Sequence, residues 1–260
     1  MKHIIKKETL LLSKDTGFNT VSVLRRGETV TLWSGSNKQT EIIVNGDRDF
    51  TPNLEYSRNS FLALGFHPEP RSILVLGLGG GAIPTLLHRI LAEVVIDVVD
   101  IDPEMVAIAR EYFHFSQSER LRVFIDDAFY FLRDTQTQYD IVIMDAYIGN
   151  QLPETVDTMA FIAEARRVMT PRGVFVANLM SAHQTLFKAM LERIEKIFEH
   201  IRLLPGIIST NTLVFATRKP VPKSEILERM RNLVQAFPFE LKYSRMVSRL
   251  ENYSGSDHTP

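Results

Sequence analysis

The chain of 260 residues contains no cysteine, and its formal net charge is only −1. Without cysteine no disulfide framework can form, which suits a reducing compartment. The balanced charge offers no basic footprint for nucleic acid, so we expect no nucleic-acid partner. We find no signal peptide, and no apolar run reaches the roughly 20 residues that span a bilayer. We therefore expect a cytoplasmic, soluble protein with no membrane partner.

Two kinds of β-structure are predicted. Within residues 1–52, β-branched and alternating residues at 20–24, 28–33 and 39–44 predict the strands of a small N-terminal β-module. A helix is expected over residues 54–65. From residue 72 onward, short apolar strands alternate with helices, a pattern that indicates an α/β fold with a doubly wound, mostly parallel sheet.

The end of the chain refines this fold class. Two strands at residues 200–204 and 212–217 are predicted to form an antiparallel hairpin that closes the sheet. Such a hairpin is typical of seven-stranded methyltransferase-type (Rossmann-like) sheets. We therefore predict one large domain over residues 53–240 and a C-terminal tail over residues 241–260, with a frayed polar end.

A glycine cluster, Gly77-Leu-Gly-Gly-Gly-Ala82, follows the first strand of this domain and precedes a helix. Glycine lets the backbone turn sharply and approach a ligand, and a helix N-terminus favours negative or polar groups. Gly77, Gly79, Gly80 and Gly81 are therefore candidate cofactor-binding residues. The spacing also fits the nicotinamide fingerprint, and a tight turn without a ligand is a further interpretation.

Acidic residues end the next two strands. Asp100 can accept hydrogen bonds from two ribose hydroxyls, in nicotinamide and S-adenosyl ligands alike. Asp127 follows the third strand, where S-adenosyl-binding folds place an acid against the adenine amine; an N-cap role for this residue is the alternative. With the neighbouring Ile101 and Ala128, these residues should share the carboxyl edge of the sheet with the glycine loop.

Asp145 ends the fourth strand and is the candidate catalytic residue. A carboxylate there would lie near a reactive sulfonium, where it could orient or deprotonate an incoming amine. Its alternative role is to order the following loop. Residues 146–157 form a long polar connection, a candidate lid over the site. The seven histidines show no metal-site spacing, so we predict no metal ion.

Together these residues resemble the spermidine synthase (polyamine aminopropyltransferase) family, in particular its divergent spermidine synthase-like branch. The resemblance covers residues 18–217. Phe18-Asn-Thr-Val-Ser-Val23 is similar to the family strand Tyr-Gln-x-Ile-x-Val, which puts Asn19 where a cofactor-contacting glutamine stands. Gln39 matches a second family glutamine with the spacing off by one, and His67-Pro-Glu-Pro70 matches the family's linker into the nucleoside domain.

The resemblance implies an aminopropyl transfer from decarboxylated S-adenosylmethionine to a small-molecule amine, with methylthioadenosine as the other product. It implies that Asp100 holds the ribose, Asp127 the adenine and Asp145 the attacking amine. Family members usually associate through the N-terminal module, so the resemblance also implies a homodimer.

The chain departs from the family pattern at the substrate end. Gly80 replaces the acid of the family loop Gly-Gly-Gly-Asp-Gly-Gly, which pairs with the ammonium of the decarboxylated cofactor and repels the carboxylate of intact S-adenosylmethionine. Ile148 replaces the second acid of the family gate, and the Tyr-His-Glu motif expected before residue 60 is missing. A dication needs a carboxylate near each end, and Glu55, Glu154 and Asp157 are the substitutes considered.

Three other functions compete with aminopropyl transfer. A methyltransferase that uses intact S-adenosylmethionine gains weight from Gly80. A non-catalytic nucleoside-binding homologue is compatible with the missing substrate acids. A nicotinamide oxidoreductase is disfavoured by Asp127 and by the C-terminal hairpin.

Overall fold

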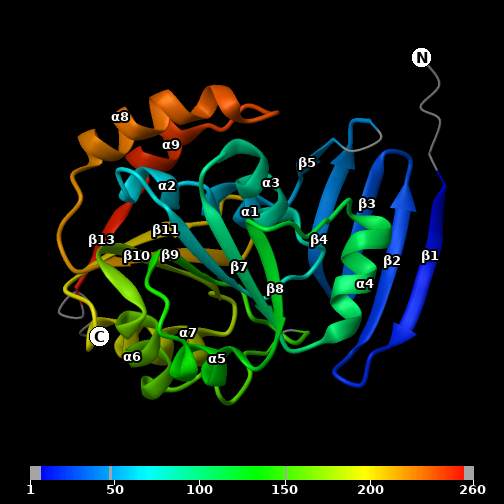
Figure 1. Cartoon of the computed structure of the whole chain (residues 1–260), viewed down its shortest axis with the longest axis horizontal. Coiled ribbons are helices and arrows are strands. Elements are labelled where there is room, and N and C mark those ends of the chain that lie inside the picture. The colour runs from blue at the N-terminus through cyan, green and yellow to red at the C-terminus, as the bar shows by residue number, and fades with distance from the viewer. Residues whose placement is uncertain (1–6, 47–48, 150, 255–260) are drawn as a thin grey trace.

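The computed structural model describes residues 7–46, 49–149 and 151–254. The N-terminal part is a five-stranded antiparallel sheet in the order β1-β2-β3-β4-β5, at the right of Figure 1. Its strands are β1 (Glu8–Asp15), β2 (Thr20–Arg26), β3 (Thr29–Ser34), β4 (Asn37–Val44) and β5 (Phe50–Pro52). These strands form the small β-module that the sequence predicts.

The second sheet has eight strands in the order β13-β11-β12-β10-β9-β6-β7-β8. The strands are β6 (Ser72–Leu76), β7 (Val95–Asp100), β8 (Leu121–Ile125), β9 (Tyr139–Met144), β10 (Met169–Met180), β11 (His200–Pro205), β12 (Asn211–Thr217) and β13 (Glu251–Tyr253). The five from β8 to β10 pair in parallel, whereas β12, β11 and β13 pair antiparallel. The predicted sheet type and closing hairpin are confirmed.

The C-terminal segment differs from the expected tail. Within residues 241–254, helix α9 (Tyr243–Ser248) packs on the domain, and β13 adds an eighth strand at the edge of β11. Met246, Val247 and Leu250 are buried in the core, which explains why this segment folds back. The polar residues beyond position 250 show no hydrophobic strand pattern, so the sequence did not predict this strand. An edge strand needs only backbone pairing on one side.

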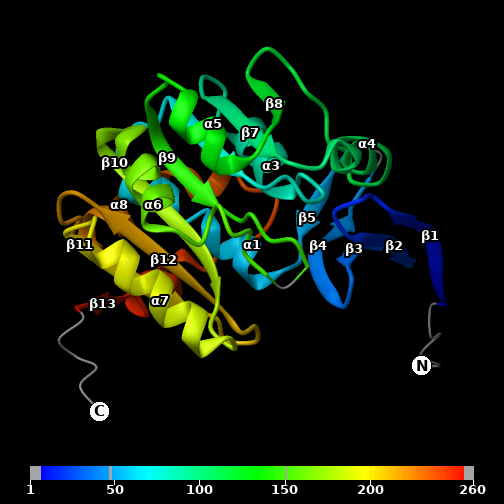
Figure 2. The same cartoon turned by 90° about the horizontal axis from the view of Figure 1, so that it is seen from below.

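Helices cover both faces of the large sheet (Figures 1 and 2). Side chains alternate along β9, so that Ile141 and Ile143 join one core cluster while Val142 and Met144 join the other. The helices that contribute side chains to the first cluster are α1 (Glu55–Ser60), α2 (Ala63–Phe66), α3 (Ala82–Ile90), α4 (Pro103–Tyr112), α8 (Lys223–Leu233) and α9. The second contains α5 (Ala128–Asp134), α6 (Met159–Arg167) and α7 (Gln184–Glu195).

The helix expected over residues 54–65 is two short helices, α1 and α2, separated by a turn at Phe61 and Leu62. The sheet order reverses between β6 and its neighbours β7 and β9. In open α/β sheets, ligands bind outside the carboxyl ends of the strands at such a reversal. The fold therefore places the glycine loop after β6 and the acids after β7 and β9 at the expected binding edge.

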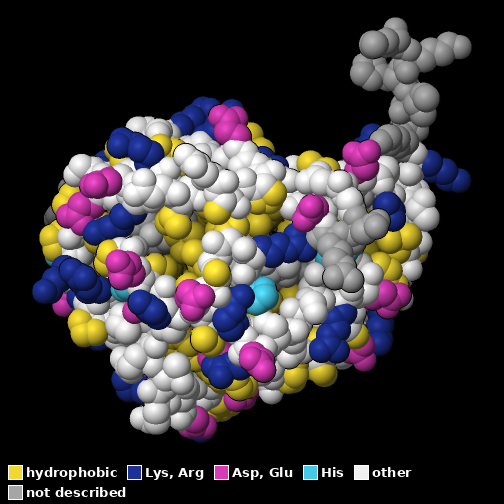
Figure 3. Space-filling model, turned by 45° about the horizontal axis from the view of Figure 1, so that its top comes forward, with side chains coloured by type: hydrophobic (Ala, Val, Ile, Leu, Met, Phe, Trp, Pro, Cys, Tyr) yellow, Lys and Arg dark blue, Asp and Glu magenta, His cyan; other side chains and the backbone are white. Residues whose placement is uncertain are grey.

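The outer surface shows no strong charge segregation on the face drawn in Figure 3, where Lys and Arg side chains are interspersed with Asp and Glu. Among the described residues, no helix is long and apolar enough to cross a membrane.

Candidate active site

The glycine loop begins where two strand ends meet. Gly77 has a φ of +99°, and a Cβ at this position would lie 2.3 Å from the carbonyl oxygen of Asp145. Its amide donates to the carbonyl of Val99 at 2.8 Å. Only glycine fits this left-handed conformation and close approach. Gly77 thus holds the ends of β6, β7 and β9 together, so that residues after each strand share one site.

Gly80 and Gly81 turn toward the protein interior and do not line the cleft described below. A Cβ on Gly80 would lie 2.9 Å from carbons of both Phe113 and Thr40, and one on Gly81 would lie 2.7 Å from the ring of Phe115. The Gly80 amide donates to Thr40 Oγ1 at 2.9 Å. An acidic side chain at position 80 would therefore have to displace Phe113 and Thr40.

Asp100 lies at the end of β7, directly beside the loop. Its Oδ2 accepts from the Leu78 amide at 2.7 Å, and its Oδ1 accepts from the Asp102 amide at 2.9 Å. Burial raises the pKa of Asp100 to about 6, although these backbone donors oppose the rise. Asp102, in turn, caps α4 by accepting from Glu104 N at 2.9 Å, the role that its sequence position predicts.

The contacts of Asp127 are compatible with both roles considered for it, the N-cap of a helix and a hydrogen bond to a ligand amine. Its Oδ1 caps α5 by accepting from Phe129 N at 2.7 Å, and its Oδ2 accepts from Thr155 Oγ1 at 2.9 Å. A carboxylate offers about four acceptor positions, so these contacts leave room for a ligand amine. The N-cap fixes the carboxylate at the edge of the cleft.

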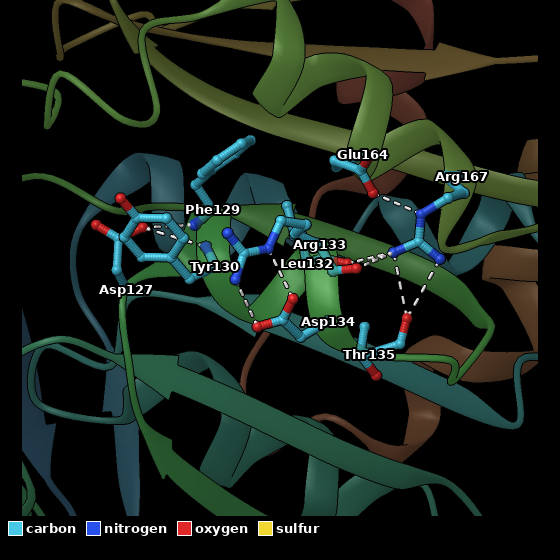
Figure 4. A network of polar contacts seen from close by, with 9 residues as sticks. All are labelled: Asp127, Phe129, Tyr130, Leu132, Arg133, Asp134, Thr135, Glu164 and Arg167. Carbon is cyan, nitrogen blue, oxygen red and sulfur yellow. Dashed lines mark hydrogen bonds and ion pairs between the residues drawn. The ribbon is translucent and has the colours of Figure 1, made fainter.

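The opposite end of α5 is also anchored (Figure 4). The Arg167 guanidinium, from the last turn of α6, donates to the carbonyls of Leu132, Arg133 and Thr135. A cationic donor at a helix C-terminus satisfies the free carbonyls and complements the helix dipole. With both ends of α5 held, the helix N-terminus and Asp127 have a defined position.

Asp145 follows β9, and the pKa of its carboxyl group is raised further than that of Asp100. Its Oδ1 accepts from Asn178 Nδ2 at 2.7 Å, and the Tyr56 hydroxyl lies beside it while donating to the Gln39 carbonyl at 2.6 Å. Burial raises the pKa of Asp145 to about 7, and the contacts with Asn178 and Tyr56 only partly oppose this. A carboxyl with this pKa can exchange a proton near neutral pH.

Asn178 and Tyr56 were missed by the sequence reasoning. Asn178 lies on β10 and is 4% exposed, and its Oδ1 accepts from Asn211 Nδ2 at 2.9 Å, which fixes the amide orientation toward Asp145. A polar residue inside an otherwise apolar strand was the available signal for Asn178, because buried polar groups need partners. Tyr56, on a short helix, carried no such signal.

The first cleft lies at the carboxyl edge of β6, β7, β8 and β9 and encloses about 1000 Å³, including the part open to solvent. Most of the residues predicted to bind a cofactor line it: Asn19, Gln39, Gly77, Gly79, Asp100, Ile101, Asp127, Ala128 and Asp145. Gln39 Nε2 donates to the Gly149 carbonyl at 3.0 Å, so the β-module closes one side against the loop after β9.

A second cleft continues from the first. It is bounded by the β-module, by α1 and by the β11–β12 turn, and it shares Gln39, Tyr56, Asp145 and Tyr147 with the first cleft. Asp145 therefore lies where the two clefts meet.

The described part of residues 146–157, the candidate lid, is held by several contacts, which include a hydrogen bond from Met180 N to the Tyr147 hydroxyl at 3.1 Å. Thr155 bonds to Asp127, and Asp157 Oδ1 pairs with Arg193 Nη1 at 2.6 Å. Pro153 and Val156 add apolar surface to the first cleft. Within the described ranges, no three His, Cys, Asp or Glu side chains are grouped as metal ligands.

The chain is similar in sequence to known transferases. The model of the spermine/spermidine synthase domain matches residues 60–217. The chain is 29% identical over 204 residues to the polyamine aminopropyltransferase of Vibrio vulnificus (strain CMCP6), covering 75% of this chain and 68% of that protein. It is 30% identical over 194 residues to the human eEF1A lysine and N-terminal methyltransferase, covering 66% of this chain but 28% of that protein.

A solved spermidine synthase in complex with the transition state analogue AdoDATO shares the fold with a TM-score of 0.73, at 18% identity, covering 92% of this chain and 83% of that chain. The fold and the similar proteins together define a transferase with a methyltransferase-type α/β domain. The chain belongs to the spermine/spermidine synthase domain family.

Proposed function

We propose that this spermidine synthase-like transferase moves an aminopropyl group from decarboxylated S-adenosylmethionine to an amine. The observation that carries the proposal is Asp145, a carboxyl with a pKa of about 7 at the junction of two clefts. One cleft has the features of a nucleoside site, and the other is open for an acceptor. A proton acceptor between them is what transfer to an amine requires.

The first cleft fits an S-adenosyl nucleoside. We assign Asp100 to the ribose hydroxyls, because it ends β7 directly beside the loop between β6 and α3. We assign Asp127 and Ala128 to the adenine, with Ile101 and Val156 as apolar walls, because all four line this cleft. We assign Asn19 and Gln39 to the same site, where they lie on the β-module side of the cleft.

The bound nucleoside supplies an electrophilic carbon next to its sulfonium. The acceptor nitrogen forms a bond to that carbon, the carbon–sulfur bond breaks, and its electron pair stays on sulfur in methylthioadenosine. Asp145 accepts the proton that the amine loses. Asn178 holds the Asp145 carboxyl in place through the 2.7 Å hydrogen bond to Oδ1.

Methyl transfer from intact S-adenosylmethionine is the second candidate. The packing of Phe113 and Thr40 against Gly80 favours it, because this packing leaves no place for an acid that would select the decarboxylated form. The same Asp145 would accept the proton in either reaction, so the donor decides between them.

Calorimetric titration of the purified protein with intact S-adenosylmethionine, its decarboxylated form and methylthioadenosine tests the proposal, followed by mass spectrometry of an amine mixture. We expect tighter binding of the decarboxylated form and products heavier by one aminopropyl group. Products heavier by one methyl group would establish the second candidate. Binding of methylthioadenosine without any product would identify a non-catalytic homologue, and no binding of any of the three would refute the nucleoside site.

We also propose a homodimer that forms through the β-module. Among the described residues, the outer strand β1 pairs only with β2, and its Leu10 is 59% exposed. Such an edge is suited to antiparallel pairing with a second copy. Light scattering should give twice the mass of one chain for the wild type and the mass of a single chain for Leu10→Lys. An unchanged mass in the variant would place the contact elsewhere.

A further inference from the structure

The second cleft is lined by two carboxyl groups, although the chain lacks the acidic residues that the family has at its substrate positions. Lys38, Glu55 and Asp145 are the charged residues that line it. Lys38 Nζ is 2.6 Å from Glu41 Oε2, so its charge is already compensated. Glu55 and Asp145 are left as two carboxyl groups that face one cavity.

Glu55 is held in the ionised state by the turn between β11 and β12. Its Oε1 accepts from Ile207 N at 2.7 Å, and its Oε2 accepts from Ile208 N at 2.9 Å and Ser209 N at 3.1 Å. Partial burial acts to raise the pKa of Glu55, but these backbone donors outweigh it, and the net pKa is lowered.

The three amides orient Glu55 without cancelling its charge. Amide donors are neutral, so the full formal charge of the carboxylate remains. A fixed, ionised carboxylate on the wall of a cleft is suited to bind an ammonium through a charge-assisted hydrogen bond.

We propose that Glu55 is a specificity-determining residue that binds the far ammonium of a linear diamine acceptor, while Asp145 receives the proton of the reacting amine. This assignment rests on the proposed function and supplies the second carboxylate that the chain lacks at the family positions. The other substitutes considered do not fit. Glu154 is exposed and lines neither cleft, and Asp157 is paired with Arg193 at 2.6 Å.

The arrangement also fixes the span of the acceptor. Glu55 and Tyr56 are consecutive residues of α1, and Tyr56 lies beside Asp145. Helix α1 therefore carries both Glu55 and the tyrosine that contacts Asp145, while the end of β9 sets the position of Asp145 itself. Since Tyr56 of α1 and all of β9 are buried, we expect a fixed separation of the two carboxyl groups and a preference for acceptors of one chain length.

The test compares butane-1,4-diamine with butylamine as acceptors, in the wild type, in Glu55→Gln and in the control Glu154→Gln. We expect the wild type and the control to prefer the diamine in kcat/KM. Glu55→Gln should lower kcat/KM for the diamine by about tenfold to hundredfold, the loss of one hydrogen bond to a charged group, and leave butylamine within about twofold.

Three results would overturn the proposal. They are equal use of both amines by the wild type, an unchanged preference in Glu55→Gln, or an equal loss for both amines, which would show that Glu55 only braces the turn. Glu55→Asp, which keeps the charge on a shorter side chain, guards against misfolding of the Gln variant. It should retain a diamine preference and shift it toward a longer diamine, and loss of all preference would contradict the assignment.

A binding measurement separates this proposal from the proposed function. Calorimetry with both amines, on protein saturated with methylthioadenosine, reads the Glu55 contact without any transfer. If the wild type alkylates no amine, the proposed function fails, whereas diamine binding that Glu55→Gln weakens would still support the Glu55 site. Transfer without a difference in diamine binding between the two proteins would refute Glu55 alone.

Discussion

The protonation of Asp145 should control the pH dependence of the reaction. With a pKa of about 7, Asp145 is mostly ionised at pH 8 but only about one-tenth ionised at pH 6. An alkylamine is almost wholly protonated at both values, so it binds as an ammonium and must give its proton to the ionised carboxylate. We therefore expect kcat/KM for the amine to be level above pH 7 and to fall about tenfold per pH unit below it.

The assay is the initial rate of product formation at saturating donor, measured from pH 5.5 to 9 at constant ionic strength. The Asp145→Asn variant keeps the volume and a hydrogen-bonding side chain but removes the charge. We expect it to lower the rate at pH 8 by about 10²–10⁴-fold. Its residual rate should rise with pH through the whole range, because only free amine can then react.

One result would refute this reasoning. If the wild type also rose tenfold per pH unit through pH 7 without a break, free amine from solution would be the nucleophile and Asp145 would not accept the proton. The profile of kcat gives an internal check. A bound ammonium favours the ionised carboxylate, so the break in kcat should lie at lower pH than the break in kcat/KM.

Three further predictions follow from the same contacts. Since the folded state raises the pKa of Asp145, the free energy of unfolding of the wild type falls as pH rises from about 4 to 7. Asp145→Asn should therefore be more stable than the wild type by about 1–3 kcal/mol at pH 8 and equally stable at pH 3.5. A gain in melting temperature that persists at pH 3.5 would contradict this. Gly80→Asp should cost about 1–3 kcal/mol in denaturant unfolding, from its clash with Phe113 and Thr40, and should not improve binding of decarboxylated S-adenosylmethionine; tighter binding would show that the position is open. Asp100→Asn should weaken methylthioadenosine binding about tenfold or more by calorimetry, and unchanged affinity would remove Asp100 from the ribose site.

Much of the binding edge could be predicted from local sequence. Asp100, Asp127 and Asp145 each follow a short apolar strand, and the carboxyl ends of parallel strands meet at one edge. The alternation of strands and helices therefore placed these acids together before any contact was known. The turn at Gly77 was equally predictable, since glycine directly after a strand signals a backbone that side chains do not permit.

Tertiary packing decided the remaining features. Gly80 was expected at the ligand. Phe113 packs against this glycine, so a side chain at position 80 would meet the aromatic ring and would not enter the cleft. The C-terminal segment was expected as a tail, but the edge of β11 offered it a partner.

Glu55 shows most clearly where local patterns end. Its oxygens bind amides 152 to 154 residues further along the chain, and no periodicity links these segments. Hydrophobic alternation specifies which face of an element is buried, because burial repeats with the period of the backbone. Which polar side chain meets which distant amide depends on how the elements pack, so the sequence by itself determined the sheet and its acidic edge, and the tertiary structure decided where the second carboxylate lies.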